Sequence, residues 1–220
     1  MGFLEAAAVV YLRQLYYPEG FAFPLKPLLF TELSVEYLRE ISTIVMLIAI
    51  AVVAGSGFIE RFAYFLYCFG IWDIFYYLWL KALLAWPRSL LTWDILFLIP
   101  VVWAGPILAP VLCAATLVLL GSAILFHQER DGSVSLRRSE WTLLASGSFV
   151  IITTFMWDYG KIIIQGGFIS RFLSLGEDRR FLTIIAGHVP GPFPWLLFAV
   201  GEGLLLAFLV SFLRRTRRAF

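Results

Sequence analysis

Two carboxylates lie inside long apolar stretches of this sequence. Glu202 is the one charged residue of the stretch 194–213, and Asp73 lies in the stretch 58–84. A charge at the centre of a bilayer costs roughly 2.5 kcal/mol or more, so such acids face a bundle interior or a water-filled cavity. There they exchange protons, bind cations or hydrogen-bond a neighbouring helix. We therefore expect Asp73 and Glu202 to point into the protein, each near a polar group.

Asp73 has polar neighbours at helical spacing. Tyr77 follows four residues later, so its hydroxyl is predicted to reach the Asp73 side chain. Lys81 lies about two turns after Asp73 and is expected to extend its ammonium to the membrane interface. The set is typical of a proton or cation site, and equally of a hydrogen-bonded node between helices.

Glu202 lies between two glycines, Gly201 and Gly203. Small residues let a second helix approach closely, so Glu202 is predicted to face a partner helix and not lipid. Removal from water raises the pKa of a carboxyl group, which favours a protonated side chain there. A protonatable acid at the midplane suits proton coupling, and it equally suits a static interhelical hydrogen bond.

A basic group lies in the segment between the last two apolar stretches. One hypothesis is that these residues hold an anionic headgroup; the alternative is a solvated loop, partly paired with its own acids. The four residues are Arg171, Arg179, Arg180 and His188.

Other acids have simpler interpretations. Asp94 is predicted to stabilise the start of a helix at the interface. Asp158 and Lys161 are three residues apart and are expected to pair with each other.

The sequence does not indicate a metal, a haem or another cofactor. Its two histidines, His127 and His188, are predicted at opposite membrane faces, so they do not form a ligand pair. Cys68 and Cys113 lie in apolar stretches and are interpreted as small core residues. No catalytic or nucleotide-binding motif occurs, and a net charge of +2 does not favour nucleic acid. On these grounds the sequence favours a non-catalytic protein and leaves an enzyme as an open alternative.

The elements that carry these residues are membrane helices. The chain of 220 residues is 61% hydrophobic and 15% charged, whereas soluble domains carry roughly 25% charged residues. Continuous apolar runs of about 20 residues predict transmembrane helices. Five runs qualify: 36–53, with Ser34 as its predicted N-cap, then 58–84, 106–126, 141–163 and 194–213. We predict an all-α polytopic bundle of five to six transmembrane helices.

Two further apolar pieces are harder to assign. Residues 3–17 are too short to span and are predicted to form an interfacial helix within an N-terminal segment, 1–33. Residues 88–104, interrupted by Pro100, are either a sixth span through a thinned bilayer or a re-entrant or interface-lying helix. The rest, 34–220, is predicted to be one transmembrane domain.

Two polar segments separate the later stretches. Residues 128–140 are predicted to turn at Asp131-Gly132 between short extended arms. Residues 166–193 form a long outer loop in which 177–185 is predicted to be a short amphipathic helix.

Orientation follows from the positions of Lys and Arg near the span ends. The Arg-rich end at 214–218 predicts a cytoplasmic C-terminus, with 128–140 on the same side and 166–193 outside. If 88–104 crosses, 12 Lys and Arg lie inside and 5 outside; if not, the count is 8 inside and 9 outside, with the N-terminus outside. The charge rule favours six crossings, whereas Pro100 and the short stretch favour five.

Three segments, 72–81 (WDIFYYLWLK), 93–100 (WDILFLIP) and 194–204 (PWLLFAVGEGL), resemble an uncharacterised family of bacterial inner-membrane proteins. The resemblance covers roughly residues 60 to 205. It implies a bacterial inner membrane and carries no activity.

Three functions remain open. The first is a non-catalytic accessory or structural subunit, with other membrane subunits, a second copy and the lipid bilayer as partners. The second is a small proton-coupled transporter that uses Asp73 and Glu202. The third is a lipid-modifying enzyme, which rests on the basic loop residues.

Overall fold

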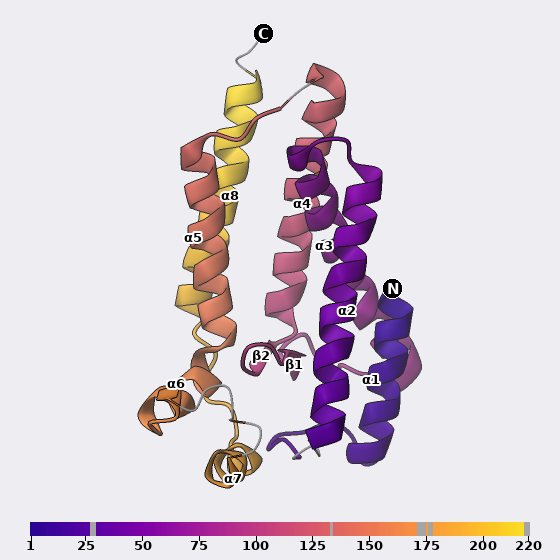
Figure 1. The fold of residues 1–220 in the computed structure, drawn as a ribbon, viewed down its shortest axis with the longest axis vertical. Helices are drawn as coiled ribbons and strands as arrows, with labels where there is room; N and C mark the ends of the chain where they lie inside the picture. The colour runs from indigo at the N-terminus through magenta and orange to yellow at the C-terminus, as the bar shows by residue number, and fades with distance from the viewer. Residues whose placement is uncertain (27–29, 133, 171–174, 176–177, 218–220) are drawn as a thin grey trace.

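The computed structural model describes residues 1–26, 30–132, 134–170, 175 and 178–217. Helices dominate the fold (Figure 1). Their bounds are α1 Gly2–Tyr16, α2 Phe30–Ala54, α3 Phe58–Leu84, α4 Leu108–Asp131, α5 Arg138–Phe155, α6 Trp157–Gln165, α7 Arg179–Gly187 and α8 Trp195–Arg217. Two short strands, β1 Trp93–Phe97 and β2 Trp103–Pro106, lie between α3 and α4.

Four helices, α2, α3, α4 and α8, are long and apolar enough to cross a membrane. The bent pair α5 and α6 together meets the same criteria, which makes up to five spans among the described residues. The chain is therefore a multi-pass helical membrane protein, as its composition predicts.

The stretch 88–104 is not a helix, so both helical predictions for it are wrong. Strands β1 and β2 pair in antiparallel fashion, with Trp93 opposite Pro106 and Phe97 opposite Trp103. Strands of five and four residues are too short to cross a bilayer. The hairpin instead lies at one end of the bundle, beneath α4 in Figure 1.

Three local predictions also need correction. The expected single helix 141–163 is broken at Met156, where α5 and α6 meet at 70°. Ser34 lies inside α2 and does not cap it. Asp131 is the last residue of α4 and not part of a turn between extended arms; Gly132 follows with φ 79°, where the helix ends.

The predicted shorter helices are present. Helix α1 covers the expected N-terminal helix, and α7 covers the expected helix of the outer loop, in part outside the described residues. Asp178 begins α7, since its carboxylate accepts hydrogen bonds from the backbone amides of Arg180 and Phe181.

Two close helix pairs form the bundle. In the first, α3 packs on α4, and a Cβ added at Gly70 would lie 2.5 Å from the Ala114 carbonyl oxygen. In the second, α5 packs on α8, and a Cβ at Gly201 would lie 3.1 Å from the Gly147 carbonyl oxygen. The two pairs meet where α4 contacts α8, which we call the seam. This contact is much less extensive than the contact within either pair.

The two ends of the bundle differ in character. Figure 1 shows α1, the hairpin, α6 and α7 toward one end, which we call the hairpin end. The end of α4, the start of α5 and the end of α8 lie at the other, which we call the arginine end after its basic residues (Figure 1). Helix α2 covers the outer side of α3 and reaches both ends (Figure 1).

Candidate intramembrane acid site

Asp94 lies at the hairpin end, in β1, paired with a residue 81 positions away in α1. Its Oδ1 accepts a hydrogen bond from Arg13 Nη2 at 2.8 Å, and the residue is only 2% exposed. The Arg13 guanidinium also lies 3.6 Å from the Trp86 ring centroid, a cation–π contact. The expectation that Asp94 stabilises a helix start is therefore wrong, because Asp94 belongs to a strand.

Burial determines the protonation of Asp94. Removal from water raises the pKa of this carboxyl to about 6, although the Arg13 guanidinium favours the charged form. Its Oδ2 atom is buried and has no hydrogen-bond partner among the described residues. Asp94 can therefore exchange a proton near neutral pH.

Asp73 lies on α3 within electrostatic range of Asp94. Tyr77 lies within electrostatic range of both acids, and its hydroxyl favours the charged form of Asp94. Among the described residues no hydrogen bond joins Tyr77 to Asp73. Tyr77 thus interacts with two acids, whereas the sequence indicated Asp73 alone as its partner.

Lys81 is not part of this acid cluster. Its Nζ atom donates a hydrogen bond of 2.8 Å to the Pro87 carbonyl oxygen beyond the end of α3. The Lys81 ammonium therefore lies near the end of the helix, as expected of an interfacial residue.

Glu202 bridges the thin seam between the helix pairs. Its Oε2 accepts a hydrogen bond of 2.8 Å from Thr116 Oγ1 of α4, whereas its Oε1 is buried without a partner among the described residues. The flanking glycines differ: Gly201 packs against α5, but nothing lies within 4 Å of a Cβ added at Gly203. Glu202 therefore faces α4, while Gly201 provides the close approach to α5.

Cys113 connects the two predicted acids. Its thiol lies on α4 within interaction range of the Glu202 carboxylate and within electrostatic range of Asp73. Asp94, Asp73, Cys113 and Glu202 thus form a series in which each group lies within electrostatic range of the next, and we call this series the acid line. It extends from the hairpin end to the seam between α4 and α8.

Polar contacts that the sequence analysis missed join α2 to α1 and to the hairpin. Arg39 of α2 pairs with Glu36 at 2.8 Å and with Glu5 of α1. Both carboxylate oxygens of Glu40 accept the backbone N–H of Leu98, at 3.0 Å each. The spacing of Glu36 and Arg39 was a local signal for one pair, but no local pattern indicates partners on other elements.

The basic loop residues have different surroundings, and the headgroup site stays a prediction. Arg179 is exposed, Arg180 lies 5.6 Å from the Phe168 ring centroid, and the His188 ring packs on Tyr159 at 5.3 Å. No hydrogen bond or ion pair joins these three side chains within the described part of the chain. Arg171 lies outside the described residues.

Asp158 and Lys161 pair as predicted, at 2.8 Å, and Asp158 also accepts the backbone N–H of Gly191. His127 lies at the arginine end, where its ring contacts Asp131 and Thr216. Among the described residues, no group of three or more His, Cys, Asp or Glu side chains is arranged to hold a metal ion.

No protein-family model, curated protein or solved structure matches the chain. The resemblance to bacterial inner-membrane proteins stays a prediction, and the function is argued from the acid line itself.

Proposed function

We propose that the protein is a small proton-coupled transporter in which Asp73 and Glu202 take up and release the coupled proton. The acid line carries this proposal. Asp94 and Glu202, near its two ends, each have a buried carboxylate oxygen without a partner among the described residues. Buried carboxylates with spare acceptor capacity inside a membrane bundle are typical of proton relays.

A groove opens at the arginine end, the other end of the bundle. It has a volume of about 1420 Å³ and runs along α8 from Gly203 to Arg214 and Arg215 at the arginine end. Gly203 directly follows Glu202 in the chain. The groove therefore begins one residue from the Glu202 end of the acid line, although Glu202 itself faces α4 and does not line it.

We propose a bacterial inner membrane, with the arginine end in the cytoplasm. The membrane assignment rests on the resemblance. With five spans the arginine end has 8 Lys and Arg and the hairpin end 9. Seven of the Arg, however, gather in two short segments next to span ends at the arginine end, 130–138 and 214–218. By the positive-inside rule the C-terminus is then cytoplasmic and the N-terminus outside.

The proposal is tested by proton uptake into reconstituted vesicles that contain a pH-sensitive dye, under an imposed membrane potential and with candidate solutes on one side. We expect uptake above that of protein-free vesicles, and Asp73→Asn should abolish it while circular dichroism shows an unchanged fold. Uptake by wild-type protein that equals the protein-free level with every solute tested refutes the transporter.

A second candidate function is that of a non-catalytic subunit of a membrane complex or homo-oligomer. The Glu202–Thr116 hydrogen bond favours it, because this bond joins the two helix pairs across their thinnest contact. In this alternative Glu202 serves only packing. Native mass spectrometry of the protein purified from its own membrane tests it: a defined complex supports a subunit role, and a monomer argues against it.

A further inference from the structure

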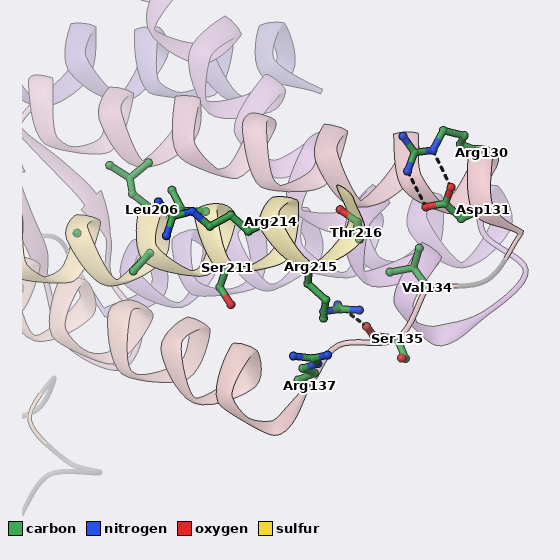
Figure 2. A pocket seen from close by; sticks show the side chains of 13 residues that line it. Arg130, Asp131, Val134, Ser135, Arg137, Leu206, Ser211, Arg214, Arg215 and Thr216 are labelled. Atoms are coloured by element: carbon green, nitrogen blue, oxygen red, sulfur yellow. Dashed lines mark hydrogen bonds and ion pairs between the residues drawn. The ribbon is translucent and has the colours of Figure 1, made fainter. Parts of the chain in front are cut away.

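The groove at the arginine end has two chemically different parts. Its floor along α8 consists of small and apolar residues: Gly203, Leu206, Ala207 and Val210. Its rim carries four guanidinium groups, those of Arg130, Arg137, Arg214 and Arg215. Figure 2 shows Arg214 and Arg215 on α8 and Arg137 on the segment that leads into α5.

The rim has more positive charge than its acids balance. Arg130 Nε pairs with Asp131 at 2.6 Å, and Arg215 Nε pairs with Glu140 at 2.9 Å (Figure 2 draws the first). The side chains of Arg137 and Arg214 form no ion pair with any carboxylate of the described residues. Two guanidinium groups thus remain for an anion outside the chain.

We infer that this groove binds an anionic phospholipid of the bilayer, with an acyl chain along the floor and its headgroup attracted to the rim, whose guanidinium groups unpaired among the described residues are those of Arg137 and Arg214. Guanidinium groups bind phosphate oxygens through paired, charge-assisted hydrogen bonds. The floor residues recur at three- and four-residue spacing, so they form one continuous apolar strip on α8.

The apolar strip favours a lipid over a soluble anion. A phosphate ion needs only the rim, and it would leave the strip from Val210 to Gly203 uncovered. The strip is also open to the bilayer, since Leu206 is 44% and Val210 45% exposed, so a lipid chain can enter the groove from the side. The groove lies at the opposite end of the bundle from the basic loop residues that the sequence suggested for headgroups. Lipid binding in the groove does not require proton transport.

Lipid binding is measured on the purified protein in a neutral detergent by native mass spectrometry and by titration with fluorescent phosphatidylglycerol or phosphatidylcholine. We expect phosphatidylglycerol to bind tighter. Arg137→Gln combined with Arg214→Gln should weaken it by at least about tenfold, since two charge-assisted contacts are lost. Arg138→Gln is the matched control, because Arg138 lies beside the groove without lining it.

Two further measurements separate the lipid from simple anion binding. Ala207→Trp fills the floor, so it should block phosphatidylglycerol without changing the melting temperature, and inorganic phosphate should compete only weakly. Equal weakening by Arg138→Gln and the double variant overturns the inference. So does full phosphatidylglycerol binding by Ala207→Trp together with complete competition by inorganic phosphate.

Discussion

Asp94 shows how one buried ion pair sets the chemistry of a site. Pairing with Arg13 favours the carboxylate, whereas burial favours the neutral acid, and burial has the larger effect on the Asp94 pKa. A buried pair of this kind is weak evidence for stability, because desolvation offsets much of the attraction. In the proposed transporter its role is to hold a carboxyl that changes protonation near pH 6.

This balance predicts a titration that can be observed directly. Difference infrared spectroscopy should show the carbonyl band of a protonated carboxyl appearing as the pH falls through about 6, the raised pKa of Asp94. The band should be missing in Asp94→Asn. In Arg13→Gln it should persist to higher pH, because loss of the cation removes what stabilises the carboxylate. A band in the wild-type protein that is unchanged in Asp94→Asn contradicts the assignment.

Thr116 supplies the hydrogen bond that positions Glu202. Thr116→Val keeps the side-chain volume and removes the donor, so the free energy of unfolding should fall by about 1 kcal/mol or less, as for other interhelical hydrogen bonds in membranes. The pH dependence of proton uptake should shift, and Thr116→Ser should restore it. An unchanged pH profile in Thr116→Val places Glu202 in a packing role alone.

The helices are held together by close backbone contacts at small residues, and Gly201 and Gly203 provide a matched test. A Cβ at Gly201 would lie 2.6 Å from Ile151 Cγ1, whereas a Cβ at Gly203 meets nothing within 4 Å. Gly201→Ala should therefore cost about 1–3 kcal/mol through overpacking. Gly203→Ala should change stability by less than about 0.5 kcal/mol. Thermal unfolding in detergent measures both, and equal losses argue against the α5–α8 contact.

The sequence predicts the long helices well because continuous apolar runs leave few alternatives in lipid. It fails at 88–104 because a short apolar run fits a buried strand as well as a helix segment. Only tertiary contacts decide there, among them the bond from the Leu98 amide to Glu40 of α2. The bend between α5 and α6 occurs at Met156 without a proline, so the local sequence gives no signal for it.

The sequence indicated only part of the acid line. Asp73 and Glu202 stand out by their apolar flanks, but nothing local connects Arg13 to Asp94, 81 residues away. Cys113 looks like an ordinary core residue until α4 places its thiol near both predicted acids. Long-range pairing is what the sequence alone does not specify.

At the scale of the whole molecule, the described helices give four spans, or five if α5 and α6 together cross once, and five crossings put the two ends of the chain on opposite sides. In a variant without Cys68 and Cys113, single cysteines at the exposed positions Gln14, Ser135 and Thr183 report this arrangement. A membrane-impermeant maleimide added to intact cells should label positions 14 and 183, at the hairpin end, and not 135. Labelling of position 135 but not 183 reverses the proposed orientation.

Glu202→Gln tests most directly whether the bundle carries protons through its acids. Gln keeps the shape and most hydrogen bonds but cannot ionise. Glu129→Gln, at an exposed position of α4, is the control for loss of an acid elsewhere. In vesicles with a pH-sensitive dye, we predict that Glu202→Gln reduces proton uptake to the protein-free level, while wild type and Glu129→Gln keep it. Wild-type uptake in a correctly folded Glu202→Gln protein contradicts the account.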